Sequence, residues 1–168
     1  AYRFNGYWKD VGTISSLWEA NMEVLDPEHS GINLFDSDWK IYSRNSGMTG
    51  HRICRGAVVE NSMITDGCHV EGTVKHSILF AGVRVEAGAK VEDAVVMGGT
   101  VIKAGAVVEH CIVAENVVIG ENAVVGAMPS ESENGVATVG PGVYIGDGAK
   151  IGPHAMVKNN VKGGEEQW

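Results

Sequence analysis

Residues 139–157 read VGPGVYIGDGAKIGPHAMV. An aliphatic residue stands at every sixth position of this stretch, and a small or branched residue follows four positions after each one. The aliphatic positions are Val139, Ile145, Ile151 and Val157. Six residues make one short strand and one corner, so three such units close a triangle and advance the chain by one strand spacing, about 4.8 Å. This step is typical of hexapeptide repeats in a parallel β-helix.

The six-residue step continues back to about residue 53, with regular shifts of register. The segment SILFAGVRVEAGAKVED begins at Ser77, AVVMGGTVIKAGAVVEH at Ala94 and CIVAENVVIGENAVVGA at Cys111, a spacing of 17 residues each time. One coil is therefore three near-hexads with one residue removed at a corner. We expect an all-β fold, a left-handed parallel β-helix of roughly six coils over residues 53–162. An antiparallel sandwich, the alternative, needs alternation of period two and turns about every 8–12 residues.

The composition describes a folded protein with an acidic balance. The chain has 168 residues, 44% of them hydrophobic, and a formal net charge of −8. Nucleic acid is not an expected partner, because phosphate binding needs clustered Lys and Arg. A membrane span is not expected either, since no apolar run approaches about 18 residues. The three cysteines Cys54, Cys68 and Cys111 form no CxxC pair, which predicts reduced, packed thiols in a cytoplasmic protein.

The region before the repeat differs in kind, and eight of the eleven aromatic residues precede residue 43. Residues 13–25 read TISSLWEANMEVL, with one apolar stripe at helical spacing. Thr13 is a natural N-cap, and Asp26-Pro27 is a natural stop. The stretch therefore predicts an amphipathic helix that must pack on another surface, most of which is expected to lie outside this chain.

Residues 26–52 show neither a helical nor an alternating period and are predicted to form an extended linker. Large apolar side chains should anchor it along a surface, because a free linker does not carry so many of them. These anchors are Leu34, Phe35, Trp39, Ile41 and Tyr42. Residues 127–137, AMPSESENGVA, interrupt the repeat and are predicted to be a polar surface loop.

Histidines decide whether the repeat itself carries chemistry, since hexapeptide β-helices frequently belong to acyltransferases with a histidine base. The candidates are His69, His76, His110 and His154. None stands beside an Asp or Asn pattern that marks an oriented base, so all four are predicted to be solvated corner residues. No HxH or HxxxH pair occurs, and no metal cluster is expected in the repeat.

Three successive segments resemble one family. Residues 6–13 read GYWKDVGT, residues 18–21 read WEAN, and residues 33–42 read NLFDSDWKIY. These strings resemble, in order, the end of the catalytic domain, its last helix and the connection to the β-helix in bacterial glucose-1-phosphate adenylyltransferase (ADP-glucose pyrophosphorylase). The resemblance implies three parts, namely a terminal piece of the nucleotidyltransferase domain, a linker and a β-helix domain, at residues 1–25, 26–52 and 53–162.

The resemblance also implies the chemistry of a whole enzyme. ATP and glucose 1-phosphate would be its substrates, and its products would be pyrophosphate and ADP-glucose for glycogen synthesis. Asp10 matches the aspartate that helps to hold catalytic Mg²⁺, so it is the implied catalytic and metal-binding residue. From the residues alone, Asp10 is also compatible with a turn or capping carboxylate. The family's glycine-rich nucleotide loop and sugar-binding Glu-Lys pair are not in this sequence, so this chain alone is expected to be inactive.

The β-helix would then have a structural, regulatory and oligomerising role, with a cytoplasmic homotetramer as the expected assembly. Two alternatives stay open: a hexapeptide-repeat acyltransferase, and the β-helix of another sugar-phosphate nucleotidyltransferase. The sequence does not identify an anionic effector, because no Lys or Arg lies between Lys103 and Lys150. The basic residues concentrate earlier, at Arg44, Arg52, Arg55, Lys75, Arg84 and Lys90.

Overall fold

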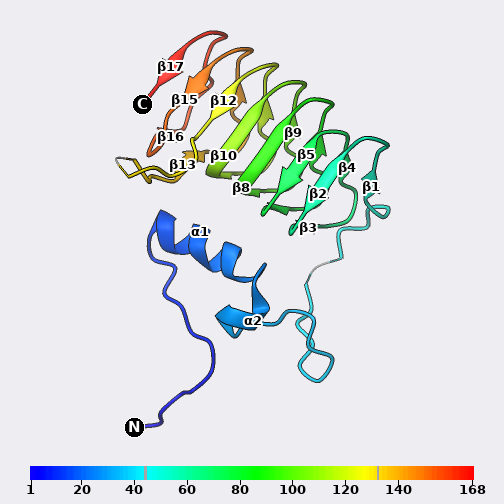
Figure 1. The fold of residues 1–168 in the computed structure, drawn as a ribbon, viewed down its shortest axis with the longest axis vertical. Coiled ribbons are helices and arrows are strands. Elements are labelled where there is room, and N and C mark those ends of the chain that lie inside the picture. The colour runs from blue at the N-terminus through cyan, green and yellow to red at the C-terminus, as the bar shows by residue number, and fades with distance from the viewer. Residues whose placement is uncertain (44, 132) are drawn as a thin grey trace.

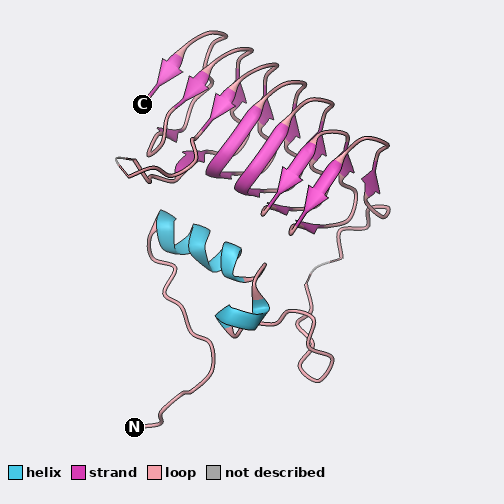
Figure 2. Cartoon of the chain, in the orientation of Figure 1, coloured by secondary structure: helices cyan, strands magenta, loops and turns pink. Residues whose placement is uncertain are grey.

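A computed structural model describes residues 1–43, 45–131 and 133–168. Short parallel strands wind into a solenoid, and one helix lies against the side of the stack (Figure 1). The N-terminal segment and the linker loop lead away from the stack (Figure 2). Arg44, one of the basic residues noted above, and residue 132 of the expected loop lie outside the described residues.

The described residues contain two helices before the strands, α1 (Ile14–Glu23) and α2 (Pro27–Ser30). Their strands, mostly two or three residues long, are β1 (Arg52–Ile53), β2 (Val58–Glu60), β3 (Met63–Ile64), β4 (His69–Val70), β5 (Thr73–Lys75), β6 (Ile78–Leu79), β7 (Arg84–Val85), β8 (Lys90–Val96), β9 (Val101–Ile102), β10 (Val107–Val113), β11 (Val118–Ile119), β12 (Val124–Val125), β13 (Ala137–Val139), β14 (Tyr144–Ile145), β15 (Lys150–Ile151), β16 (Met156–Val157) and β17 (Glu166–Gln167).

The strands pair in parallel along three faces, as a β-helix requires. One face runs β1-β4-β7-β9-β11-β14, and a second runs from β2 to β17 through β5, β8, β10, β12 and β15. The third is built from β3, β6, β13, β16 and the later parts of β8 and β10. The predicted fold class is confirmed, with about seven turns rather than roughly six. The expected β-helix ends at residue 162, but β17 continues it and sets Glu166 beside Lys150.

The aliphatic residues of the repeat fill the solenoid, as the six-residue step predicts. Ile102, Ile119 and Ile145 are fully buried. They stack directly, because Ile119 pairs with both of the others in the strand register. Val91 and Val108 repeat this arrangement on the next face. Burial of each such side chain contributes about 1.5–3 kcal/mol, so the stack is the main source of stability.

Corners of the solenoid need residues that accept a left-handed backbone. Gly105 has φ +69°, and a Cβ there would collide with the side chain of Asn122 in the next coil. Asn122 itself has φ +55°. Only glycine tolerates both the left-handed backbone and the close approach of the Asn122 side chain. This explains why a corner glycine in one coil faces a corner asparagine in the next.

Helix α1 forms where the apolar stripe predicts it. The Thr13 hydroxyl accepts from the Ser16 amide, and the Ser16 hydroxyl accepts from the Thr13 amide, which completes a capping box. The helix ends at Glu23, slightly before the predicted stop. Pro27 then begins the four-residue α2, a helical turn that the linker prediction missed. Proline suits this first position because its absent N–H needs no partner there.

Two details of the expected connections are wrong. The linker anchors do not pack on the solenoid, and Phe35, Trp39 and Tyr42 remain at least 75% exposed. The linker loops away from the solenoid and lies beside the N-terminal segment instead. The expected loop also ends early, because Val136 is buried and strand β13 begins at Ala137.

Candidate functional site

Helix α1 docks on an outward-facing row of aliphatic residues on the third face of the solenoid. Ile78, Val95 and Ile112 lie side by side in the register of β6, β8 and β10. They form one buried apolar cluster with Met22 of α1 and with Val136. Ile14, Leu17, Trp18 and Leu25 pack against the same cluster. The row therefore serves as the seat of the helix that carries the N-terminal motif.

Trp18 connects α1 to one corner of the solenoid. Its indole Nε1 donates to the Asp93 carbonyl oxygen at 2.7 Å. Its ring lies 4.3 Å from the ring of His110, centroid to centroid, at a tilt of 60°. His76, Asp93 and His110 are spaced by 17 residues and all have positive φ, so they occupy the same corner of successive coils. The indole of Trp18 thus contacts two successive coils, through Asp93 in one and His110 in the next.

The prediction of solvated, unpaired corner histidines is wrong at this corner. His76 Nδ1 lies 2.5 Å from Asp93 Oδ1 of the next coil. His110 is buried, and its Nδ1 has no hydrogen-bond partner among the described residues. No local motif in the sequence indicates this pair, because its members are a whole coil apart. His154 fits the prediction better, since its side chain is 67% exposed, although Nε2 lies 2.9 Å from Glu133 Oε1.

The N-terminal segment is tied to α1 by a small polar network. Lys9 Nζ donates to Glu23 Oε1 at 2.6 Å and to Glu19 Oε2 at 2.9 Å. The Tyr7 hydroxyl donates to Glu23 Oε2 at 2.7 Å. The bond from Lys9, and after it the bond from Tyr7, holds the pKa of Glu23 below its usual value. Tyr7 and Lys9 precede Asp10 closely in the sequence. Their bonds to α1 therefore hold the segment that leads into Asp10 against the helix.

Asp10 lies exposed between this network and the start of α1. Its Oδ1 accepts from the Gly12 amide at 3.0 Å, which is the turn contact expected of a capping carboxylate. Among the described residues Asp10 makes no other hydrogen bond, so Oδ2 is open to solvent. A hard cation such as Mg²⁺ takes carboxylate oxygens of this kind, usually one or two from protein with the rest from water and phosphate. The exposed carboxylate of Asp10 is therefore compatible with one ligand of a Mg²⁺ site whose other ligands come from elsewhere.

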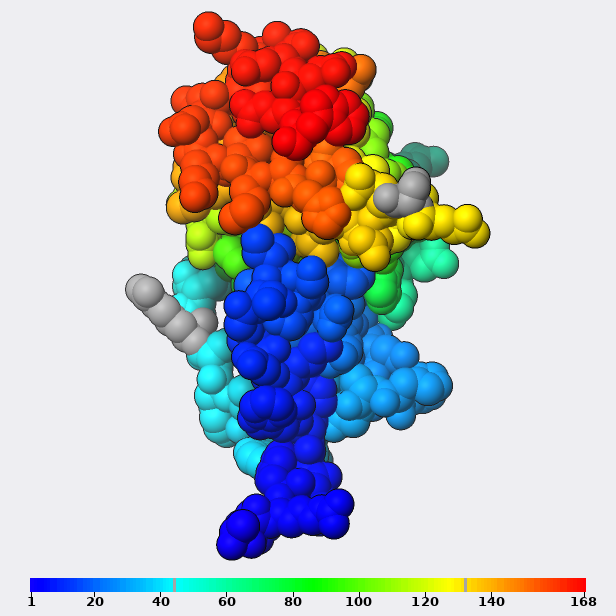
Figure 3. All heavy atoms as spheres, turned by 90° about the vertical axis from the view of Figure 1, so that its left-hand side faces the viewer, coloured from blue at the N-terminus to red at the C-terminus, as the bar shows by residue number. Residues whose placement is uncertain are grey.

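The N-terminal segment and the linker enclose an apolar groove of about 380 Å³. Phe4, Tyr7, Trp39 and Ile41 lie along it. In the space-filling view, this N-terminal part extends well beyond the C-terminal coils (Figure 3). Two of the expected linker anchors therefore meet the N-terminal segment and not the solenoid.

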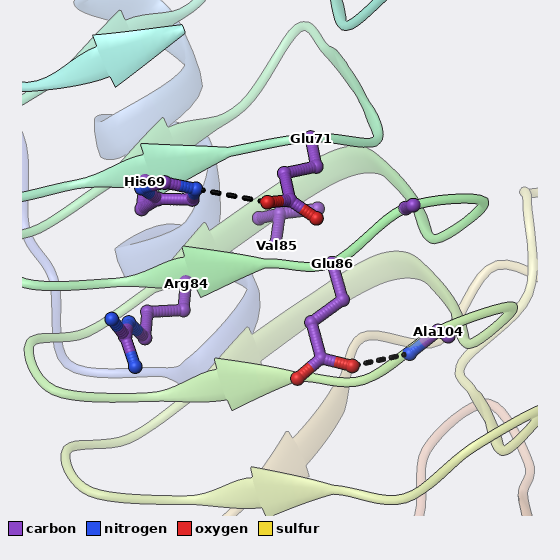
Figure 4. A pocket seen from close by; sticks show the side chains of 7 residues that line it. His69, Glu71, Arg84, Val85, Glu86 and Ala104 are labelled. Atoms are coloured by element: carbon purple, nitrogen blue, oxygen red, sulfur yellow. Dashed lines mark hydrogen bonds and ion pairs between the residues drawn. The ribbon is translucent and has the colours of Figure 1, made fainter. Parts of the chain in front are cut away.

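A second groove, of about 330 Å³, lies on the outer surface of β4 and β7. His69, Glu71, Arg84 and Glu86 project into it (Figure 4). His69 Nε2 lies 3.0 Å from Glu71 Oε1, and 3.3 Å from the sulfur of Cys54 in the preceding coil. Among the described residues these three form a group that could hold a metal ion. The search for HxH and HxxxH spacings missed this candidate group, because its members lie on two adjacent coils.

The other two cysteines match the prediction of packed thiols. Cys68 and Cys111 are buried inside the solenoid. Burial raises the pKa of both thiols, which keeps them protonated and unreactive. Of the helices described, neither α1 nor α2 is long and apolar enough to cross a membrane.

These features define a hexapeptide-repeat β-helix protein with an N-terminal helix seated on one face. The sequence profile of the family described as "GlmU-like, C-terminal hexapeptide" matches residues 48–146, and the chain belongs to that family. Curated relatives named glucose-1-phosphate adenylyltransferase, from Bacillus thuringiensis (strain Al Hakam) and Bacillus anthracis, are 58% identical to it over 86 residues. A third, from Bacillus mycoides (strain KBAB4), is 57% identical. Each match spans 51% of this chain and 23% of the relative.

Proposed function

We propose that this chain forms the C-terminal part of a glucose-1-phosphate adenylyltransferase. The observation that carries the proposal is the 58% identity to relatives of that name over half the chain. The GYWKDVGT and WEAN strings support it, because they resemble the end of that family's catalytic domain. The seat of α1 on the solenoid explains why a β-helix and the end of a catalytic domain occur in one chain.

The whole enzyme would use ATP and glucose 1-phosphate. A phosphate oxygen of the sugar attacks the α-phosphorus of ATP, the bond from that phosphorus to the bridging oxygen breaks, and pyrophosphate leaves with ADP-glucose formed. Asp10 would supply one carboxylate oxygen to Mg²⁺, and the bound ion would neutralise charge on the phosphates. The Gly12 amide holds the other oxygen of Asp10, which limits rotation of the carboxylate.

The solenoid would serve as a rigid support for the catalytic domain and as a subunit contact. The exposed aromatic side chains of the N-terminal segment and linker are suitable contacts for that domain, since Trp8, Phe35 and Trp39 are all at least 75% exposed. We propose a cytoplasmic homotetramer that makes ADP-glucose for glycogen synthesis. A regulatory role of the β-helix is part of the same proposal.

An acyltransferase is the second candidate, and the His76–Asp93 pair is the observation that favours it. A carboxylate on one ring nitrogen is how an oriented general base is held. Against this, Trp18 of α1 donates a hydrogen bond to the Asp93 carbonyl oxygen, and its ring packs on His110 at the same corner. The pair is thus better explained as part of the helix seat.

Pyrophosphate release tests the proposal. The full-length protein should release pyrophosphate from ATP with glucose 1-phosphate, and should do so poorly with other nucleotides or with N-acetylglucosamine 1-phosphate. The chain of 168 residues alone should release none. Equal activity with another sugar phosphate would favour a different nucleotidyltransferase, and binding of acetyl-CoA by the chain would favour the acyltransferase.

A further inference from the structure

Cys54, His69 and Glu71 come together because of the strand register. His69 and Glu71 are two positions apart on and just after β4, so both point outward while Val70 between them is buried. Ile53 pairs with Val70, and the Cys54 amide donates to the Val70 carbonyl at 2.8 Å. Cys54 therefore stands beside Glu71 on the adjacent strand. Three donors of different chemistry converge on one patch of the outer face.

The contacts are those of a ligand set and not of a proton relay. A Cys-His-carboxylate relay uses both ring nitrogens, one for the thiol and one for the carboxylate. Here the thiol and the carboxylate both lie against Nε2 of His69, at 3.3 and 3.0 Å. One nitrogen carries either a proton or a lone pair, so it cannot donate to Glu71 and accept from Cys54 together. A cation among the three atoms satisfies all of them.

We propose that Cys54, His69 and Glu71 bind a Zn²⁺ ion, with water as the fourth ligand. Their donor atoms all lie within 4.8 Å of one another. Zn–S and Zn–N bonds of about 2.3 and 2.0 Å place tetrahedral ligand atoms roughly 3.3–3.6 Å apart. The two separations from His69 Nε2, 3.3 and 3.0 Å, are close to this range. Thiolate, neutral imidazole and carboxylate are all ligands that zinc accepts, and their summed charge of −2 matches the ion.

The surroundings of the three side chains suit such a site. Arg52 and Arg84 flank His69 in the strand register, one on each side. The thiolate, the carboxylate and Zn²⁺ would sum to no net charge, so the two arginines would face a neutral site. Glu86, which lies beyond Glu71 in the groove, accepts from the Ala104 amide at 3.0 Å and so is held away from the three donors. His69 and Glu71 both line the groove drawn in Figure 4, which offers room for the water ligand.

The ion would fasten the first coil of the solenoid to the second. Strand β1 is held to β4 by only two residue pairs. The side chains at this end are poorly covered, as Ile53 and Val58 are both more than 40% exposed. A metal bond from Cys54 to His69 and Glu71 would stabilise this end, because binding that needs the folded arrangement adds to folding stability.

Metal titration of the reduced chain tests this proposal. One equivalent of Zn²⁺ should bind per chain, and Co²⁺ should give the near-ultraviolet thiolate charge-transfer band of a tetrahedral site. Cys54→Ser should abolish that band, and both Cys54→Ser and His69→Gln should weaken Zn²⁺ binding by about 10²-fold or more. His154→Gln is the matched control, because His154 lies beside Glu133 but belongs to no described cluster with a cysteine. This variant should bind Zn²⁺ as tightly as the unchanged chain.

Thiol protection on the unmodified chain gives a second test that needs no variant. Zn²⁺ should slow the reaction of Cys54 with iodoacetamide at least about tenfold, whereas buried Cys68 and Cys111 act as unreactive internal controls. Protection of Cys54 should be reversed by a chelator. Absence of stoichiometric Zn²⁺ binding, binding that survives Cys54→Ser, or alkylation of Cys54 that Zn²⁺ leaves unchanged would each overturn the proposal.

Discussion

Replacement of Trp18 by phenylalanine should loosen α1 from the solenoid without unfolding it. The indole of Trp18 makes the 2.7 Å hydrogen bond to the Asp93 carbonyl and the ring contact to His110. Phenylalanine retains most of the apolar contact with the cluster around Ile78 and Val95. It removes the donor, however, and leaves a part-buried carbonyl without its partner.

The magnitude follows from these two contacts. Loss of a hydrogen bond of this kind costs about 0.5–1.5 kcal/mol, and a weaker ring contact adds roughly 0.5 kcal/mol. A total of about 1–2 kcal/mol corresponds to a roughly 5–30-fold larger population of detached helix. Because α1 can detach while the solenoid stays folded, global melting is a poor measure of the effect.

Native-state amide hydrogen exchange is the suitable assay. In Trp18→Phe, amides of α1 (Ile14–Glu23) should exchange roughly 5–30-fold faster, whereas those of β8 and β10 should keep their rates. Trp39→Phe is the control, since that side chain is 77% exposed and is not part of the cluster that seats the helix. Unchanged exchange of α1 in Trp18→Phe, or an equal change in Trp39→Phe, would refute the role given to the indole.

Further predictions concern the core, the acid response and the assembly of the chain. Ile119→Asp buries a carboxylate between Ile102 and Ile145 and should cost at least about 3 kcal/mol, and an unchanged thermal midpoint would count against the stacked core. Because the pKa of Glu23 is lowered in the folded chain, its contribution to stability is full above the ordinary value of about 4.5 and is lost as the pH falls through the lowered value. The protection of α1 amides, measured relative to their intrinsic exchange rates, should therefore fall below about pH 4.5. This fall should be absent in Glu23→Gln and present in Glu28→Gln. The isolated chain should also self-associate, and a strictly monomeric species in dilute light scattering would contradict this.

The interior of the fold was predictable because an aliphatic residue recurs at every sixth position, and this recurrence identifies the buried side chains. Ile119 and its equivalents repeat at a spacing that survives shifts of register, so their burial is read from the chain directly. The capping role of Thr13 was equally local, since the hydroxyl and the amide it accepts from are three residues apart. Signals of this kind need no knowledge of which coils are neighbours.

The seat of α1 was missed, although the sequence contained its signal. In the string SILF, Ile78 and Leu79 are adjacent aliphatic residues, and neighbours in a strand point to opposite faces. Leu79 fills the solenoid, so Ile78 must point outward, and the same holds for Val95 beside Val96. Consecutive aliphatic residues repeated at a spacing of 17 thus indicate a strand covered on both faces.

The polar clusters were not predictable from local motifs. Cys54 and His69 are 15 residues apart, and His76 and Asp93 are 17 apart. Each pair is formed only when one coil stacks on the next in a particular register. Searches for short spacings such as HxH therefore fail in a solenoid, where the spacing that brings side chains together is that of one coil.

The proposed role of Asp10 is tested most directly by Asp10→Asn in the full-length enzyme, with turnover and melting measured on the same preparation. The amide oxygen of asparagine can still accept from Gly12, so the turn and the thermal midpoint should be retained. Loss of one charge at the metal should lower turnover by about 10²-fold or more, with partial recovery at high Mg²⁺. Asp38→Asn, an exposed change in the linker, should leave both quantities unchanged. Normal turnover of Asp10→Asn at ordinary Mg²⁺, with or without a loss of stability, would contradict the proposed active-site role and leave Asp10 as a capping carboxylate.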